Sequence, residues 1–359
     1  MSKALQELTE TIQPLKSKKE MESKIDPTDT WDILKSIKKS LDKQFETENS
    51  LIRLGDKDNH PLPSISTGLM TLDWDVIGCG GLAEGRQIEI FGPESSGKTS
   101  LALHCIAQKQ KLGKLCAIVD SEHSLSPEYA KILGVDLDSL IFAQPDSGEQ
   151  SVTTVQELVN SGIVSLIVVD SVAALVPSSE LEGDIGGSFM GQQARLMSQS
   201  MRVLRGTCNV HKCTIIWINQ TRMKIGVVYG NPETTTGGMA LRFYTSLRLH
   251  VKRKEAIKDG DVQIGHQINI KAVKNKCGAP FRDTTVDLLY DSGIDCLSDT
   301  IQYAVNHGII ARSGSWFALG DEKLGQGLEN VKQALLDDPT LLASIQNKIK
   351  ESLDKPQSV

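Results

Sequence analysis

The sequence Gly92-Pro93-Glu94-Ser95-Ser96-Gly97-Lys98-Thr99 decides the fold that we expect for this chain. Before it, residues 87–91 (Gln-Ile-Glu-Ile-Phe) have the composition of a buried strand, and after it Leu103 and Ile106 have the apolar spacing of a helix that packs on a sheet. A strand, a glycine-rich loop and a helix in this order are the context that a phosphate-binding loop requires. A glycine- and serine-rich turn that matches by chance is the alternative, and the flanking strand and helix disfavour it.

The spacing within this loop predicts its chemistry. Glycines at both ends let the backbone curl until its N–H groups point inward, and the helix N-terminus adds a partial positive charge, so that the loop can hold a polyphosphate. Lys98 is expected to reach the β- and γ-phosphates, and Thr99 to offer its hydroxyl to Mg²⁺. We therefore predict a nucleotide site that is lined by residues 92–99 and by the next residue, Ser100.

Composition narrows the class of protein. The chain has 359 residues, of which 39% are hydrophobic and 23% charged, as in an ordinary globular protein with one large core and small additions. It has no run of eighteen apolar residues, and its first thirty residues contain several acidic side chains, which disfavours a membrane span, a secretory signal and a transit peptide. We expect a cytoplasmic protein.

The cysteines and the net charge add two further limits. Seven cysteines are scattered without a Cys-x-x-Cys pair, which is typical of reduced thiols and disfavours a zinc site. The net charge is −6, so a nucleic acid must be held by local basic patches and backbone amides and not by a global field.

Polar residues follow three further apolar runs, where strands of a parallel sheet would end. Glu122 comes after residues 116–119, and this position lies beside the phosphates in an open parallel sheet, where Glu122 could polarise an attacking water. A surface carboxylate or a helix cap remains the alternative. Asp170 follows residues 166–169 and is expected to anchor Mg²⁺ through water. Gln220 follows residues 214–218 and is a candidate switch that senses the γ-phosphate.

Two glycine-rich segments do not have the pattern of a helix or a strand. They are residues 182–191 and 229–238, and each is followed by basic residues: Arg195 and Arg202 after the first, Arg242 and Arg248 after the second. Backbone N–H groups with a few guanidinium groups suit a phosphodiester backbone and confer little sequence preference. Disorder without a function is the alternative.

The rest of the chain flanks this core. Leu34, Ile37, Leu41 and Phe45 form an apolar stripe from Trp31 to Phe45, which packs either on the chain's own core or on a neighbouring subunit. Strands are expected over residues 246–253, 267–273 and 284–290, and the cation-rich residues 271–276 are equally consistent with a solvated turn. After Cys296 we expect a separate small lobe with a short hairpin near Trp316 and a last helix over residues 341–353.

With these residues in view, the chain resembles the bacterial RecA family of DNA strand-exchange recombinases over about residues 31–354. The motifs that carry the resemblance recur in order: residues 92–99, 169–175 (Val-Asp-Ser-Val-Ala-Ala-Leu), 219–226 (Asn-Gln-Thr-Arg-Met-Lys-Ile-Gly), 230–238 (Gly-Asn-Pro-Glu-Thr-Thr-Thr-Gly-Gly) and 274–276 (Lys-Asn-Lys).

The resemblance implies a role for individual residues. Glu122 matches the residue that activates water, Gln220 the one that couples the γ-phosphate to DNA, and Tyr129 an aromatic residue stacked on adenine. Lys274 and Lys276 match lysines that reach the ATP of the neighbouring subunit, and Phe243 matches an interface residue. Segments 182–191 and 220–240 match two DNA-binding loops, and the DNA contacts are then expected at Met190, Arg195, Arg202, Arg222, Gly237 and Gly238.

We therefore expect an α/β fold: a RecA-like P-loop NTPase core with a mostly parallel central sheet, an N-terminal helical arm and a small α+β C-terminal domain. The expected boundaries are 1–30 for a mobile extension, 31–60 for an oligomerisation arm, 61–295 for the ATPase core and 296–359 for the C-terminal domain. The amphipathic arm would then dock on the next protomer.

The implied function is a DNA-dependent ATPase that uses ATP and Mg²⁺, forms filaments on single-stranded DNA and exchanges strands with duplex DNA. Repressors that cleave themselves are further candidate partners, and no membrane is involved. A ring-shaped motor or helicase of the same fold is one alternative, which the lack of zinc-binding cysteines and the amphipathic segment disfavour. A nucleotide-gated scaffold that assembles on DNA without strand exchange is the second.

Overall fold

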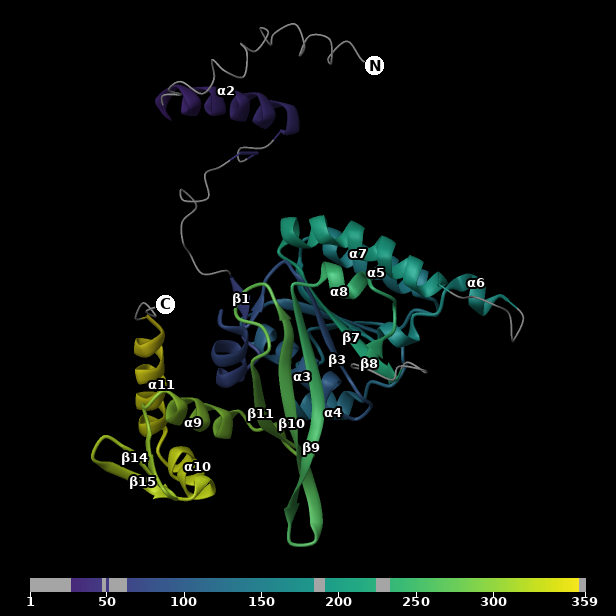
Figure 1. Ribbon diagram of the computed structural model, residues 1–359. Coiled ribbons are helices and arrows are strands. Elements are labelled where there is room, and N and C mark those ends of the chain that lie inside the picture. Colours follow the sequence, from purple (N-terminus) through teal and green to yellow (C-terminus); the bar gives the residue numbers. More distant parts are fainter. Residues whose placement is uncertain (1–26, 47–49, 52–62, 184–190, 224–232, 355–359) are drawn as a thin grey trace, which may run out of the picture. The chain divides into compact units, whose positions relative to one another are not determined.

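The computed structural model describes residues 27–46, 50–51, 63–183, 191–223 and 233–354 (Figure 1). Its contacts divide the chain into two compact units, Met1–Pro61 and Leu62–Val359. The first unit contains the helix α2 (Pro27–Phe45), which begins four residues before the predicted start at Trp31. Proline suits the first turn of a helix because its fixed φ is helical and its missing N–H has no partner there.

The predicted apolar stripe lies on α2. Leu34 and Leu41 are half-buried, whereas Ile37 and Phe45 are exposed. A hydrogen bond ties Ser50 back to the last turns of the helix: the N–H of Ser50 donates to Asp42 Oδ1 over 2.9 Å. The predicted helix is confirmed, and its docking on a neighbouring subunit stays a prediction.

The second unit is built on a ten-stranded sheet with the order β12-β11-β10-β9-β3-β7-β6-β4-β5, in which β8 pairs with β7. The strands from β9 to β5 pair in parallel, and β9 to β12 pair antiparallel. The predicted α/β class with a mostly parallel sheet is confirmed. The strands are β3 (Gln87–Gly92), β4 (Leu115–Asp120), β5 (Leu140–Ala143), β6 (Val164–Asp170), β7 (Thr214–Met223), β8 (Glu233–Thr235), β9 (Leu247–Asp259), β10 (Val262–Asn275), β11 (Asp283–Leu289) and β12 (Gly293–Ile294).

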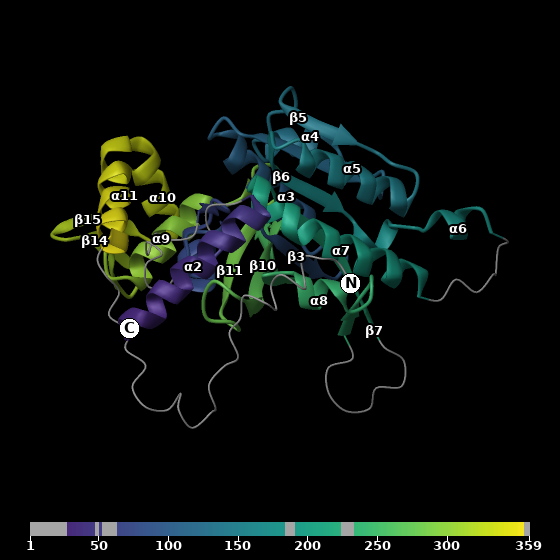
Figure 2. The ribbon, with the colours of Figure 1, turned by 90° about the horizontal axis from the view of Figure 1, so that it is seen from above.

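Helices cover both faces of this sheet (Figures 1 and 2). Alternate residues of one strand face opposite sides: Ile216 and Ile218 of β7 belong to the core that contains α3, whereas Ile215 and Trp217 belong to the core that contains α5 and α7. A strand that is buried on both faces has the continuous apolar run that the sequence shows. The helices are α3 (Lys98–Gln110), α4 (Pro127–Ile132), α5 (Gly148–Asn160), α6 (Ser178–Leu181), α7 (Gln192–His211) and α8 (Ala240–Tyr244), with the π-helix η2 (Thr71–Ile77), the 3-10 turn η3 (Val172–Ala174) and the short pair β1 (Ser64–Ile65) and β2 (Leu82–Ala83).

The last part of the chain has a hydrophobic cluster of its own. Tyr303, Phe317, Leu335 and Ile345 are buried in it, and Trp74 of η2 packs against it. A three-stranded antiparallel sheet replaces the predicted short hairpin, because Ala311–Ser313 adds a strand beside Trp316. The elements are α9 (Cys296–Asn306), β13 (Ala311–Ser313), β14 (Trp316–Leu319), β15 (Glu322–Gln326), α10 (Leu328–Asp337) and α11 (Pro339–Asp354).

The structure decides one open alternative and corrects one expectation. Residues 271–275 belong to β10, as the expected strand over residues 267–273 requires, and they do not form the solvated turn that the sequence left open, since Lys271 and Lys274 both pair with β9. The second glycine-rich segment is not irregular throughout, because β8 pairs with the end of β7. Glycine and threonine content misled the prediction here, since a three-residue strand is too short to show a period. Within the described residues, none of the helices has both the length and the apolar character that a membrane span needs.

Buried histidines predict a loss of stability in acid. Burial lowers the pKa of His104 on α3 to about 4, and the charge of Lys111 acts in the same direction. Between pH 6.5 and 4 the unfolded chain therefore binds a proton that the folded chain does not, so the free energy of unfolding falls as the pH falls. For His104 alone, the expected loss between pH 7 and pH 5 is about 2 kcal/mol.

Urea unfolding at pH 7 and pH 5 measures this loss. His104→Gln should show the smaller difference between the two pH values, while the exposed histidine variant His123→Gln should keep the wild-type difference. Burial also lowers the pKa of His250 and His266, and their contribution remains in both variants. Equal pH dependence in His104→Gln and the wild type would contradict this assignment.

Candidate nucleotide site and its surroundings

The carboxyl ends of four neighbouring strands meet at one edge of the sheet. Gly92 of β3 lies opposite Gln220 of β7, and Asp120 of β4 lies opposite Asp170 of β6. Ligands bind outside the carboxyl ends of the strands in open parallel sheets. The register therefore brings the glycine-rich loop, the segment after β4 and the ends of β6 and β7 to one place, as predicted.

The loop between β3 and α3 has the conformation that a phosphate-binding loop needs. Gly97 lies at the N-cap of α3 with φ +89°, and Ser95 also has a positive φ of 53°. A Cβ on Gly92 would lie 2.0 Å from the carbonyl oxygen of Val251, so glycine is required there. Among the residues that the structure describes, the buried Ser96 hydroxyl has no hydrogen-bond partner, which fits a loop that binds an anion.

Lys98 lies at the start of α3 and is almost fully buried. Its ammonium group donates a hydrogen bond to the carbonyl oxygen of Pro93 over 2.6 Å, across the loop. Burial lowers the pKa of Lys98, while the carboxylates of Asp170, Glu122 and Glu94 oppose that shift. A desolvated cation that faces several carboxylates at the mouth of a loop is placed to bind phosphate.

Thr99 and Asp170 lie together, as the prediction of a shared cation requires. The Thr99 hydroxyl donates to Asp170 Oδ2 over 2.7 Å. Burial raises the pKa of Asp170 to about 6, and the charges of Glu122 and Asp120 add to this. The residues fit Mg²⁺, since a hydroxyl and a carboxylate are the hard oxygen ligands that this ion prefers, and a cation would stabilise the charged carboxylate.

Glu122 is held by two side chains, one from Ser171 directly after β6 and one from Gln220 of β7. The Ser171 hydroxyl donates a hydrogen bond to Glu122 Oε1, and the Gln220 amide donates to the same oxygen over 2.9 Å. Glu122 itself is exposed, so water can reach it. The structure thus brings the predicted base and the predicted switch into direct contact.

Tyr129 lies beside the start of α3. Its hydroxyl is 2.7 Å from the hydroxyl of Ser100, and one of the two groups donates to the other. Ser126 caps α4, because its side chain accepts a hydrogen bond from the N–H of Tyr129. The cap holds the backbone of Tyr129, and the contact with Ser100 holds the hydroxyl end of its ring beside the glycine-rich loop.

A second network joins β3, β7 and the second glycine-rich segment. The Asn219 side chain donates to the buried Glu89 carboxylate over 3.0 Å and to the carbonyl oxygen of Thr236 over 3.1 Å. The Thr236 hydroxyl donates back to Asn219 Oδ1, which also accepts from the N–H of Gln220. Any displacement of Gln220 is thereby linked to the end of the segment 220–240.

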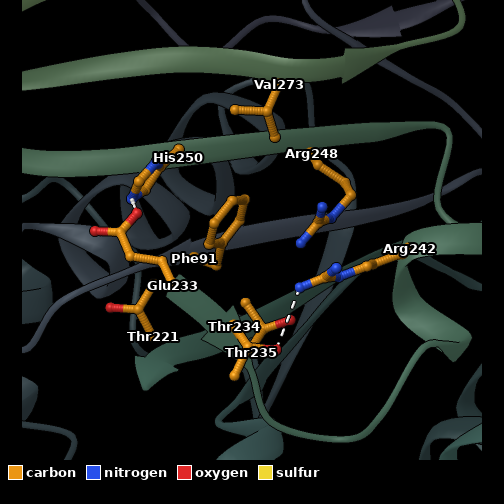
Figure 3. A pocket seen from close by; sticks show the side chains of 9 residues that line it. All are labelled: Phe91, Thr221, Glu233, Thr234, Thr235, Arg242, Arg248, His250 and Val273. Carbon is orange, nitrogen blue, oxygen red and sulfur yellow. Dashed lines mark hydrogen bonds and ion pairs between the residues drawn. The ribbon is translucent and has the colours of Figure 1, made fainter. Parts of the chain in front are cut away.

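A pocket of about 280 Å³ lies between β3, the ends of that segment and β9 (Figure 3). Phe91, the residue before the glycine-rich loop, stacks on His250 at 4.6 Å between ring centroids, and the guanidinium of Arg248 lies 4.5 Å from the Phe91 ring centre. Arg248 also forms an ion pair with Glu89. The Arg248 guanidinium is therefore bound by Glu89 and Phe91 within the protein, contrary to the expectation that it binds DNA.

The predicted DNA contacts lie at the ends of the two glycine-rich segments. Arg195 and Arg202 are exposed on α7, seven residues apart and thus on one side of the helix, and Arg222 is exposed on β7. Gly237 and Gly238 have positive φ, and a Cβ on Gly238 would lie 2.8 Å from the Ala194 side chain of α7. The ends of the two segments thus lie together. Met190 lies outside the described residues.

Lys274 and Lys276 are not part of the cluster around Lys98. The Lys274 ammonium donates to the carbonyl oxygens of Arg242 and Phe243, over 2.6 and 3.2 Å, at the C-terminus of α8. Burial lowers the pKa of Lys274 to about 8, with the charges of Lys276 and Arg248 adding to this. Lys276 and Phe243 are exposed, so the three residues predicted at a subunit contact share one surface.

Sequence reasoning missed several residues that position the site. Ser171, Glu89, Asn219 and Thr236 received no role, although they hold Glu122 and link β7 to the second segment. A signal existed for Glu89, since a carboxylate inside an otherwise apolar strand must find a partner.

The fold and this site define a P-loop ATPase, with a lysine and a threonine at a glycine-rich turn and acidic residues at the next strand ends. Comparison with known proteins narrows the class. Residues 32–295 match the family model of the RecA N-terminal domain, and residues 298–354 match that of the RecA C-terminal domain.

Several curated relatives share about half of their residues with this chain over most of both lengths. Protein RecA of Clostridium novyi (strain NT) is 51% identical over 311 residues, which are 87% of this chain and 88% of the relative. Protein RecA of Paracoccus denitrificans is 50% identical over 325 residues, 90% and 91% of the two chains. Protein RecA of Chlorobaculum tepidum is 51% identical over 315 residues, 88% and 90%.

The chain belongs to the RecA family. It is a DNA-dependent ATPase that forms filaments on single-stranded DNA and catalyses homologous pairing and strand exchange in recombinational repair. The predicted family, fold class and function are confirmed, and the nucleotide, the metal and the individual site residues are proposals.

Proposed function

We propose that the loop of residues 92–99 binds ATP with Mg²⁺ and that Glu122 drives its hydrolysis. The observation that carries this proposal is the contact of Glu122 with Gln220 and Ser171, next to Lys98 and the Thr99–Asp170 pair. Lys98 would leave Pro93 to bind the β- and γ-phosphates. Mg²⁺ would be held by Thr99 and, through water, by Asp170, and it would neutralise charge on the phosphate oxygens. Tyr129 would stack on the base.

Glu122 is the proposed general base. Its carboxylate would accept the proton of a water that attacks the γ-phosphate, and hydrogen bonds from Ser171 and Gln220 to Oε1 leave Oε2 for that water. The exposed position of Glu122 suits a group that must meet bulk water before each turnover.

Gln220 is the proposed link between the γ-phosphate and DNA. Its amide would move from Glu122 to the γ-phosphate when ATP is bound, and Asn219 and Thr236 would transmit that movement to the segment 220–240. Exposed Arg195, Arg202 and Arg222, with Gly237 and Gly238, would then hold the phosphodiester backbone. Met190 is proposed to contribute from the first segment, residues 182–191.

The proposed site is completed by a neighbouring protomer. Lys274 and Lys276 would reach the ATP of the next subunit, so ATP would favour aligned protomers and DNA binding together. Phe243 and the arm of residues 31–60 would form the subunit contact. The core is proposed to span residues 61–295 and the small domain residues 296–359, with residues 1–30 as an extension. Self-cleaving repressors are proposed partners of the filament in the cytoplasm, at the nucleoid.

ATP hydrolysis with and without single-stranded DNA tests the proposed site. We expect phosphate release to need both ATP with Mg²⁺ and single-stranded DNA, and electron microscopy to show helical filaments in the same mixture. Equal rates with and without DNA, or hexameric rings, would contradict the proposal.

The Gln220→Ala variant isolates the proposed link. Without the amide, ATP binding should persist, but the increase in DNA affinity that ATP causes should fall at least about tenfold, a loss of about 1.4 kcal/mol of coupling. Fluorescence anisotropy of a labelled oligonucleotide, with and without a non-hydrolysable ATP analogue, measures this. Gln144→Ala, at another strand end, is the matched control and should respond to ATP like the wild type.

A further inference from the structure

The turn that follows β10 is fixed against the end of η2. Asn275 Nδ2 donates to the carbonyl oxygen of Ile77 over 2.9 Å, and Asn275 Oδ1 accepts from the N–H groups of Cys277 and Gly278 over 2.9 and 3.1 Å. A Cβ on Gly278 would lie 2.4 Å from the same Ile77 oxygen, so only glycine allows this approach. The two backbone segments touch, and each carries a cysteine beside the contact, Cys79 and Cys277.

Both thiols are half-buried beside this contact, and they lie close enough for each to shift the pKa of the other. The neighbouring Cys79 thiol lowers the pKa of Cys277, and the nearby Arg86 guanidinium acts in the same direction. The influence of Cys277, together with burial, raises the pKa of Cys79, whose thiol donates a hydrogen bond to the carbonyl oxygen of Gly81 over 3.3 Å. A partly accessible thiolate beside a cation and a second thiol is the arrangement of a redox-sensitive cysteine with its resolving partner.

The other cysteines differ from this pair. All seven cysteines are free thiols, and burial raises the pKa of each of the remaining five, which makes them poor nucleophiles. The five are Cys105, whose pKa is raised, and Cys116, Cys208, Cys213 and Cys296, whose pKa is raised to about 12.

We propose that Cys79 and Cys277 are a peroxide-reactive pair whose oxidation to a disulfide fixes the turn that carries Lys276. The Cys277 thiolate attacks one oxygen of hydrogen peroxide, the O–O bond breaks, and the products are a sulfenic acid and hydroxide, which takes up a proton to give water. The Cys79 thiol then attacks the sulfenic sulfur, and its proton leaves with the hydroxide as a second water. The two thiols lose two electrons, and the peroxide is reduced to two waters.

The disulfide bears on the activity because Lys276 immediately precedes Cys277. The N–H of Lys276 is bonded to the carbonyl oxygen of Ser246 over 2.9 Å, and its side chain is exposed. A covalent link at the next residue removes the backbone freedom with which Lys276 would reach a nucleotide on the neighbouring protomer. This step rests on the proposed function, and we expect oxidation to lower the DNA-stimulated ATPase rate about tenfold.

Mass spectrometry of the full-length protein after brief treatment with hydrogen peroxide tests the pairing by itself. Alkylation and digestion should yield a peptide pair linked through Cys79 and Cys277, while the five other thiols remain alkylated. The rate of disulfide formation should rise with pH through neutrality and level off at a lower pH than an ordinary thiol would, because the pKa of Cys277 is lowered. Oxidation of Cys277 no faster than that of Cys296, or a disulfide only between chains, would overturn the pairing.

Variants separate the two thiols. In Cys79→Ser, Cys277 should stop at the sulfenic acid, which a cyclic diketone traps, whereas Cys277→Ser should leave Cys79 reduced. Cys296→Ser is the matched control and should form the disulfide at the wild-type rate. Because the wild-type measurement needs no substitution, a variant that fails to fold does not remove the test.

The ATPase readout tests the consequence separately. The oxidised wild type should lose about tenfold of its DNA-stimulated rate and regain it with a thiol reductant, while Cys79→Ser should keep its rate after the same treatment. A complete disulfide with an unchanged stimulated rate would overturn the effect on Lys276. If the reduced protein itself shows no DNA-stimulated hydrolysis, the proposed function fails and the mass-spectrometric test of the pair still stands.

Discussion

Lys98→Ala is expected to lower DNA-stimulated ATP hydrolysis by at least about 10³-fold and to abolish ATP-dependent strand exchange. The ammonium group of Lys98 is the cation at the base of the loop, and it lies within the field of the Asp170, Glu122 and Glu94 carboxylates. Without it, the phosphates of ATP would meet this negative charge in a desolvated loop. Phosphate release in the presence of single-stranded DNA and a joint-molecule assay measure the two losses.

Two further variants sharpen that test. Lys98→Arg keeps the charge, but a planar guanidinium does not fit the space that the ammonium group occupies beside Pro93, so we expect a large loss there as well. Lys111→Ala removes an exposed lysine just beyond the same helix and should leave the rate unchanged. An active Lys98→Ala protein would show that ATP is hydrolysed at another site.

The parts of the site that are contiguous in sequence could be predicted from it. The loop of residues 92–99 is one uninterrupted segment, so the positions of its glycines, lysine and threonine follow directly from the sequence. Glu122, Asp170 and Gln220 each follow an apolar strand, and the rule that strand ends converge in a parallel sheet was sufficient to group them. Local sequence pattern and one topological rule were thus enough to predict that these residues cluster at one edge of the sheet.

The contacts that hold this cluster depend on register, which the sequence pattern does not determine. Ser171 reaches Glu122 only because β4 and β6 are adjacent with Asp120 opposite Asp170. Arg248 resembled a DNA contact because it follows a glycine-rich segment, but β9 pairs with β3 and places it opposite Glu89. The desolvation of the buried Glu89 carboxylate must be compensated by a partner. This carboxylate therefore binds the Arg248 guanidinium more strongly than a solvated DNA phosphate could.

The proposed coupling between ATP and DNA would have a short physical route in this structure. Gln220 and Asn219 are consecutive residues of β7, and their side chains contact the proposed base and the end of the second glycine-rich segment respectively. On a strand, consecutive side chains point to opposite faces, so one strand can contact both. A movement of β7 would therefore change both contacts together.

Glu122→Gln is expected to lower the rate of hydrolysis by about 10²- to 10⁴-fold while ATP and DNA binding persist. The glutamine carbonyl oxygen can still accept the hydrogen bonds of Ser171 and Gln220, so the geometry of the site should be preserved. A neutral amide, however, takes no proton from the attacking water. Single-turnover phosphate release gives the chemical rate, and the dissociation of labelled DNA in the presence of ATP gives the lifetime of the filament.

The lifetime is the more informative of these two measurements. If hydrolysis releases the lysines of the neighbouring protomer and the DNA-binding segments, then Glu122→Gln filaments should remain on DNA with ATP as long as wild-type filaments do with a non-hydrolysable analogue. Glu128→Gln, an exposed carboxylate on α4, is the matched control and should dissociate at the wild-type rate. Slow hydrolysis combined with fast dissociation would mean that ATP turnover does not release DNA. The proposed role of Gln220 as the link between the γ-phosphate and DNA would then also be wrong.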